Sequence, residues 1–249
     1  MILLNPKFIH LNDFIESIPQ RFEHEGRYIY GGRRNLIKAL DAPDGTRLNV
    51  KRFCQPNCIN RLVYSAGWRK PKGLRAFTYP DILLERGIDT PEPVAYIEQR
   101  HFHLIAQSYF ISLQCDYPHT LYDMGNASPE DYEPMAHALA AFTANMHRKQ
   151  VMHRDYSPGN ILWTKDNDGY HFTIVDINRM YFGPVGMEEG CRNFARLWGP
   201  KRFLACLARE YAAEMGFDPE TCEQILMHTR ERFWKRYTRK HDVPFKIEY

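Results

Sequence analysis

The sequence predicts an α+β protein of two domains, a β-rich domain followed by a mostly helical one. Short segments in which apolar and polar residues alternate, as they do in strands, dominate residues 1–116. Segments with helical spacing of apolar residues dominate residues 117–249. A polar, turn-rich connection over 117–126 lies between the two patterns, so we predict domains at 1–116 and 117–249.

The composition is that of an ordinary globular protein. Hydrophobic residues make up 44% and charged residues 25%, and the net charge of +3 does not indicate a nucleic-acid partner. The cysteines are scattered apart from Cys54 and Cys58, which favours reduced thiols over a zinc site. The N-terminus does not resemble a signal peptide, and no apolar run approaches the roughly 20 residues of a spanning helix. We therefore expect a cytoplasmic protein.

Three strands are predicted early in the chain. They cover residues 27–30, 36–40 and 47–53. Asp44-Gly45 is a strong hairpin signal between the second and third strands. In the third strand Leu48 and Val50 share one face, and Lys51 lies on the other.

Helices become frequent further along the chain. A helix is predicted over 74–86, followed by strands over 94–99 and 103–113. Ser128 and Pro129, with acidic residues directly after them, mark the start of a long helix. Two short strands at 161–163 and 172–175 and two final helices at 202–215 and 219–240 complete the prediction.

The strongest functional signal is His153-Arg154-Asp155, with Asn160 five residues after the aspartate. This run matches the catalytic-loop pattern of kinases. Phosphoryl transfer needs a carboxylate that orients the acceptor hydroxyl and takes its proton, and Asp155 is the candidate for that role. Mg²⁺ prefers hard oxygen ligands, and the side chain of Asn160 can supply one.

A second acid completes the predicted metal site. Asp176 ends the apolar run 172–175, as the metal-binding aspartate of kinases ends a strand. It is followed by Ile177-Asn178 rather than Phe-Gly, so we expect no regulated flip of this segment.

The nucleotide side of the site has weaker signals. Lys51 is the candidate partner of the α- and β-phosphates, and Lys38 on the preceding strand is its competitor. The turn at Gly31, Gly32 and Arg33 can offer backbone N–H groups to the phosphates.

The acidic partner of this lysine is not evident. The helix at 74–86 lacks a glutamate over 77–82, which leaves Asp81, Glu85 or no helix residue as the partner of Lys51.

Together these residues resemble the lipopolysaccharide core kinase family, the Kdo/WaaP (InaA-type) group of small bacterial kinases. The matching segments are Gly-Gly-Arg-Arg-Asn at 31–35, Val-Lys-Arg-Phe at 50–53, Gly-Ile-Asp-Thr-Pro-Glu-Pro at 87–93, the catalytic loop at 153–160 and Val-Asp-Ile-Asn-Arg-Met at 175–180. The segments at 90–93 and 176–180 are the most specific, because generic protein kinases and aminoglycoside kinases lack them.

The resemblance implies a protein-kinase-like bilobal fold. The N-lobe would hold an antiparallel sheet plus one helix, and the short C-lobe would be mostly helical. The implied reaction transfers the γ-phosphate of ATP, with Mg²⁺, to a Kdo or heptose hydroxyl of the lipopolysaccharide inner core. The implied place is the cytoplasmic face of the inner membrane, with a peripheral membrane contact. By this resemblance Lys51 binds phosphate, Asp155 is the base, and Asn160 and Asp176 hold magnesium.

An anionic glycolipid substrate would make basic residues candidate contacts. Arg33 and Arg34 follow the glycine pair. A basic cluster in the last predicted helix comprises Arg230, Arg232, Lys235, Arg236, Arg239 and Lys240. This cluster is either a solvated helix face or a patch for an anionic surface.

Two other functions stay open. Arg154 beside the aspartate is typical of protein kinases, so a minimal bacterial protein kinase acting on Ser, Thr or Tyr is one alternative. The other is a nucleotide-binding pseudokinase, suggested by the reduced glycine loop and by Thr78 where a kinase helix has its glutamate. The sequence does not distinguish the acceptor hydroxyl or the oligomeric state.

Overall fold

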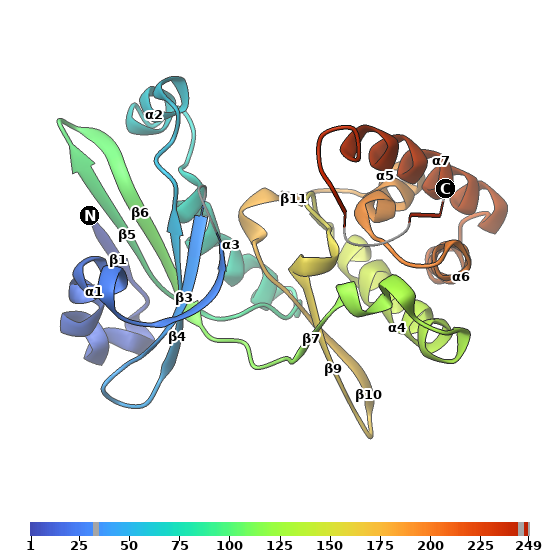
Figure 1. Cartoon of the computed structure of the whole chain (residues 1–249), viewed down its shortest axis with the longest axis horizontal. Coiled ribbons are helices and arrows are strands. Elements are labelled where there is room, and N and C mark those ends of the chain that lie inside the picture. Colours follow the sequence, from blue (N-terminus) through green and yellow to red (C-terminus); the bar gives the residue numbers. More distant parts are fainter. Residues whose placement is uncertain (32–34, 244–246, 249) are drawn as a thin grey trace. The chain divides into compact units, whose positions relative to one another are not determined.

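The computed structural model describes residues 1–31, 35–243 and 247–248, without the side chains of Cys58 and Asn60. The chain forms two compact units (Figure 1). The N-terminal unit contains residues 1–85 and 90–116, and the C-terminal unit contains 86–89 and 117–249. Among the described residues, no helix has both the length and the apolar character needed to cross a bilayer.

The N-terminal unit is built on a six-stranded antiparallel sheet. Its strands are β1 (Ile2–Leu4), β2 (Arg27–Gly31), β3 (Asn35–Asp41), β4 (Arg47–Phe53), β5 (Pro93–His101) and β6 (Leu104–Leu113), in the order β1-β5-β6-β4-β3-β2. The predicted hairpin joins β3 to β4. Asp44 Oδ1 accepts from the Thr46 N–H at 2.9 Å, and Gly45 takes the φ of 86° that this turn requires.

Helix α1 (Asn12–His24) covers one face of this sheet, and the sequence prediction missed it. Ile15, Ile18 and Phe22 recur at helical spacing, are fully buried and pack in one core with Val50 and other sheet residues. The core gains stability because this apolar surface leaves water, at about 25 cal/mol per Å².

Two further helices lie in this unit, α2 (Cys58–Ser65) and α3 (Lys72–Glu85). The described residues of this unit thus form three α-helices, where the sequence predicted one. Gly73 lets α3 approach the sheet, since a Cβ at this position would lie 2.5 Å from the Tyr96 ring and 3.3 Å from the Phe53 ring. Every residue from 93 to 98 of β5 is buried: Val94, Ala95 and Ile97 belong to the α1 core, whereas the Tyr96 ring lies against Gly73 of α3.

The C-terminal unit is mostly helical. Its α-helices are α4 (Pro129–Arg148), α5 (Met187–Asn193), α6 (Lys201–Met215) and α7 (Pro219–Tyr237). Its strands form two small sheets, β10-β9-β7 from Gly169–Ile174, Ile161–Asp166 and His119–Thr120, and β11-β8 from Met180–Phe182 and Val151–His153. Short 3₁₀ turns lie at Leu121–Asn126, Pro158–Asn160, Ile177–Arg179 and Phe194–Arg196.

Helix α4 forms the centre of this unit. It begins at Pro129, directly after Ser128, as predicted. Met135, Leu139 and Met146 recur along it at helical spacing and are fully buried. Figure 1 shows α4 and α6 lying side by side, with α7 next to α6. Helix α4 also contacts strand β8, which leads into the predicted catalytic loop at 153–160.

Candidate active site

His153 anchors the start of the catalytic loop. It ends β8 and is completely buried. Its Nδ1 accepts from the Asp155 backbone N–H at 3.1 Å, so its ring proton lies on Nε2, which donates to the Val175 carbonyl at 3.0 Å. Burial lowers the pKa of His153, because a charged ring would lose its hydration. A neutral imidazole therefore connects the loop to the segment that carries Asp176.

The loop closes around the backbone carbonyl of Asp155. The Ser157 N–H and the side-chain nitrogen of Asn160 both donate to this oxygen at 2.8 Å. The Asn160 carbonyl accepts from the Val175 N–H at 3.0 Å. Asn160 uses its amide nitrogen here, which leaves its side-chain oxygen for another partner. These bonds bring Asp155, Asn160 and Asp176 into one small region of the C-terminal unit.

Asp176 has an unusual backbone conformation. It lies two residues after β10 with φ 55° and ψ 41°, in the left-handed region that costs a residue with a side chain free energy. Asn178 Nδ2 donates to Asp176 Oδ1, while Asn178 Oδ1 is buried and has no hydrogen-bond partner in the described part of the chain. Asn178 therefore orients the candidate metal ligand, a role that the sequence prediction did not assign.

Two arginines bind the carboxylate of Asp155, and the sequence prediction gave neither of them a role at this position. Arg196 Nη1 binds Oδ1, and Arg179 Nη1 lies 3.2 Å from Oδ2. The Asp155 side chain is 21% exposed, so a substrate hydroxyl can reach it. A carboxylate has about four acceptor positions, and the arginines use two of them. A hydroxyl bound to Asp155 would therefore lie beside two positive charges.

Aromatic rings hold the arginines around the loop. The guanidinium of Arg196 lies 5.3 Å from the centre of the Phe233 ring on α7, and that of Arg154 lies 5.0 Å from the centre of the Tyr181 ring on β11. Cation–π contacts of this kind restrict a flexible side chain while leaving its N–H groups able to donate. The sequence carried no signal for these pairs, because each joins two segments that are distant in the chain.

Lys51 and Lys38 belong to the N-terminal unit. Lys51 is 8% exposed in β4, with its ammonium group 5.3 Å from the centre of the Phe53 ring. Lys38 donates to the carbonyls of Phe22 and Glu25, at 2.6 and 3.0 Å. These carbonyls lie at the C-terminal end of α1, so Lys38 caps that helix. Lys51 is thus the better candidate for a phosphate ligand.

The glycine turn is described only at its first residue. Gly31 has φ 137°, and a Cβ there would lie 2.2 Å from the Asn35 carbonyl oxygen, so only glycine fits. Gly32, Arg33 and Arg34 lie outside the described residues. Asp81 and Glu85, the two acids proposed for Lys51, are exposed on α3.

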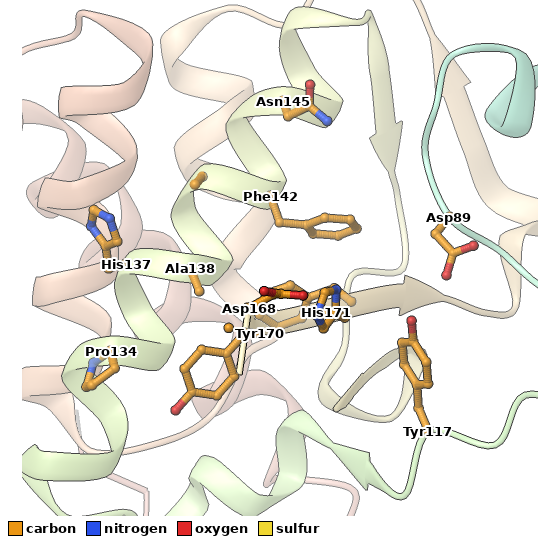
Figure 2. Close-up of a pocket in the computed structure, with 13 residues that line it drawn as sticks. Asp89, Tyr117, Pro134, His137, Ala138, Phe142, Asn145, Asp168, Tyr170 and His171 are labelled. Carbon is orange, nitrogen blue, oxygen red and sulfur yellow. The ribbon is translucent and has the colours of Figure 1, made fainter. Parts of the chain in front are cut away.

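A surface groove of about 820 Å³ lies elsewhere in the C-terminal unit (Figure 2). Figure 2 shows His137 and Phe142 of α4 on one side of it and His171 of the β9–β10 hairpin nearby. None of Asp155, Asn160 and Asp176 lines this groove. It is therefore distinct from the predicted catalytic residues.

Three solved structures resemble the chain. WaaP in complex with acyl carrier protein has a TM-score of 0.61 and 17% sequence identity, over 95% of this chain and 99% of that chain. The MAP kinase LmaMPK10 from Leishmania major has a TM-score of 0.43 and 13% identity, over 96% and 75% of the two chains. The Rio2 kinase from Chaetomium thermophilum has a TM-score of 0.45 and 14% identity, over 91% and 77%. The last two are too distant to support an argument.

The sequence comparisons identify the family. No curated protein matches the sequence. The model of the lipopolysaccharide kinase (Kdo/WaaP) family matches residues 32–197, which is more than half of the chain. The likeness to WaaP confirms the predicted protein-kinase-like α+β fold. The chain therefore belongs to the lipopolysaccharide kinase (Kdo/WaaP) family, as its sequence motifs predicted.

Proposed function

We propose that this protein transfers the γ-phosphate of ATP to a Kdo or heptose hydroxyl of the lipopolysaccharide inner core, on the cytoplasmic face of the inner membrane. The observation that carries the proposal is the hydrogen-bonded catalytic loop. It gathers the carboxylate of Asp155 with the candidate metal ligands Asn160 and Asp176 in a chain of this family. Generic binding modules do not need this combination of groups.

Each residue has a distinct role in the proposed reaction. Asp155 orients the acceptor hydroxyl and takes its proton as the new bond to phosphorus forms. Asn160 and Asp176 offer oxygen ligands to Mg²⁺, which would neutralise charge on the phosphates when bound. Lys51 contributes a positive charge for the α- and β-phosphates, together with the turn that contains Gly31, Gly32 and Arg33.

The acceptor is expected to be an anion. Arg179 and Arg196 both contact Asp155, so a hydroxyl that binds this carboxylate lies within about 6 Å of each guanidinium group. Arginine binds carboxylate and phosphate well, often through two parallel hydrogen bonds. A sugar acid such as Kdo, or a phosphorylated sugar, would supply the negative charge that water and neutral sugars lack.

A protein partner is also part of the proposal. The similar WaaP structure contains acyl carrier protein, and we infer that a carrier protein of this kind binds the present chain too. Copurification of the two proteins after coexpression would support this partner, and separate elution at micromolar concentration would exclude stable binding.

The proposed function is tested with labelled ATP and three acceptors: Kdo-containing lipid, heptose-containing core lipid and a generic protein substrate. We expect transfer to one of the lipids, and Asp155→Asn should lower turnover by about 10²–10⁴-fold, the usual contribution of a general base. ATP binding should persist in this variant. Arg192→Gln is a matched control, because Arg192 pairs with Glu188 on α5 and not with Asp155. Equal turnover by Asp155→Asn and wild type would exclude the mechanism, and transfer to protein alone would favour a protein kinase.

A further inference from the structure

The N-terminal unit exposes a group of large apolar side chains at one end. Among the described residues, the three most exposed large hydrophobic side chains are Trp68, Phe102 and Ile59, at 84%, 83% and 75%. Leu62 is exposed by 59% on the same helix as Ile59. We call these four residues the apolar tip.

The members of the apolar tip lie on neighbouring elements. Arg61 Nε of α2 donates to the Ile105 carbonyl at 2.8 Å, and the Ile105 N–H donates to Ser65 Oγ at 3.1 Å. These bonds attach α2 to β6 just beyond the β5–β6 turn that carries Phe102. Figure 1 shows α2 near the ends of β5 and β6. Trp68 lies three residues after the end of α2, and its N–H donates to the Val63 carbonyl of that helix at 3.1 Å, which attaches it to the same element.

Folding of the unit does not explain the exposed apolar side chains. Helix α2 already buries Tyr64, which is 6% exposed, while Ile59 and Leu62 remain outside. Each exposed side chain forgoes the stabilisation that burial of an apolar residue provides. Large apolar side chains exposed to this degree on neighbouring elements fit an interaction surface.

The segment that contains α2 and Trp68 carries an excess of positive charge. The sequence has no Asp or Glu from residue 45 to residue 80. Arg69, Lys70 and Lys72, directly after Trp68, are all exposed. The surface therefore combines protruding aromatic and aliphatic side chains with a local excess of cations, and an anionic partner is complementary to it.

We propose that the apolar tip, with Arg69, Lys70 and Lys72, docks the protein on the anionic surface of a phospholipid bilayer. Trp68 and Phe102 enter the headgroup region, where amphipathic aromatic rings are favoured, and the cations bind lipid phosphates. A bilayer suits these side chains better than a folded protein does, because they protrude from a helix, a turn and a hairpin rather than line a groove. The proposal concerns attachment alone and does not depend on the proposed kinase reaction.

Vesicle flotation of the full chain tests this surface. One vesicle preparation contains phosphatidylcholine only, and the other contains phosphatidylcholine with phosphatidylglycerol. Wild type should float with the anionic vesicles and bind the neutral ones at least about tenfold more weakly. The double variant Trp68→Ser, Phe102→Ser and the triple variant Arg69→Gln, Lys70→Gln, Lys72→Gln should each lose about tenfold or more in binding to the anionic vesicles.

A matched control separates this surface from general exposure of apolar residues. Ile9→Ser with Tyr30→Ser removes two residues of the same unit that are 65% and 71% exposed but lie outside the apolar tip. This variant should bind vesicles as wild type does. Circular dichroism must show the same secondary structure in all variants.

Several results would overturn the proposal. Failure of the wild-type protein to bind either kind of vesicle would contradict it. Binding of the Trp68→Ser, Phe102→Ser variant at the wild-type level would contradict it too. A third result would show that the apolar tip binds a protein instead of a bilayer. In that case wild type would bind acyl carrier protein but not vesicles, and the Trp68→Ser, Phe102→Ser variant would not bind acyl carrier protein. Turnover with a water-soluble acceptor is measured separately, so a failure of the kinase reaction is distinguishable from a failure of membrane docking.

Discussion

At the scale of single residues, the two arginines on Asp155 lead to a prediction about the acceptor. Arg196→Gln removes the cation that Phe233 holds beside the carboxylate. We expect KM for a sugar-acid acceptor to rise about 10–100-fold, the equivalent of one lost charge-assisted hydrogen bond, whereas KM for ATP stays within about twofold. Steady-state kinetics with each substrate varied in turn measures both values.

The methyl ester of the same sugar acid separates recognition of the anion from other effects of Arg196→Gln. The ester carries no charge, so wild type should use it poorly and the variant should lose little further activity with it. Arg192→Gln serves as the control, because its guanidinium pairs with Glu188. An equal loss with acid and ester would show that Arg196 supports the loop rather than the acceptor.

The candidate residues that the sequence could indicate are those that lie close together in the chain. Asp155 and Asn160 lie in one loop, and Asp176 directly follows the apolar run 172–175, so spacing alone indicated all three candidates. The contacts of Arg179 and Arg196 with Asp155 span 24 and 41 residues. Such contacts depend on the pairing of β8 with β11 and on the placement of the turn Phe194–Arg196. No periodicity or motif encodes that geometry.

At the scale of elements, the strands with clear turns were predicted well and several short elements were missed. Strand β4 was predicted at its observed bounds, because Asp44 and Gly45 fix its start and alternation marks its length. Helix α1 was missed although its buried residues have helical spacing, since Pro19 and charged residues interrupt the pattern. Strands β8 and β11 have three residues each and exist only through their tertiary pairing.

The structure also corrects the prediction for the basic cluster of the last helix. The sequence placed Arg230 in an exposed patch, but Arg230 is 2% exposed and binds the Glu248 carbonyl, so this assignment was wrong. Lys235 pairs with Glu231 at 2.5 Å on the same helix. The other five cations, Arg232, Lys235, Arg236, Arg239 and Lys240, remain exposed, so most of the predicted cluster does face the solvent.

Helix α5 offers a test of packing between elements. A Cβ at Gly190 would lie 2.1 Å from Tyr211 Oη and 3.0 Å from its Cζ. Tyr211 is fully buried on α6 and bound to His147, so it cannot move aside freely. We expect Gly190→Ala to lower the free energy of unfolding by about 1–3 kcal/mol despite the better helix propensity of alanine, as overpacking does. Urea denaturation followed by circular dichroism measures the change.

Two further variants check the cause of this loss. Arg192→Ala, on the exposed side of α5, should change stability by no more than about 0.5 kcal/mol. In a Tyr211→Phe background the closest contact is gone, so Gly190→Ala should cost less than it does in wild type. The same cost in both backgrounds would contradict a clash with the hydroxyl.

At the scale of the whole molecule, buried histidines make stability depend on pH. His147 is 2% exposed, and burial lowers its pKa to about 4, from an ordinary value near 6.5. The unfolded chain therefore binds a proton at a pH where the folded chain does not, so stability is highest above about pH 6.5 and falls as the pH drops towards 4. The lowered pKa of His153 acts in the same direction.

A comparison with His147→Gln isolates one of these histidines. Glutamine keeps a polar side chain but does not titrate, and contributions from His153 and the carboxyl groups cancel in the difference between the two proteins. Between pH 8 and pH 5, wild type should lose about 2 kcal/mol more of its free energy of unfolding than the variant, as the two pKa values require. Urea denaturation curves at a series of pH values give this difference. Parallel pH profiles for the two proteins would mean that His147 binds a proton equally well in the folded and unfolded states, contrary to its burial.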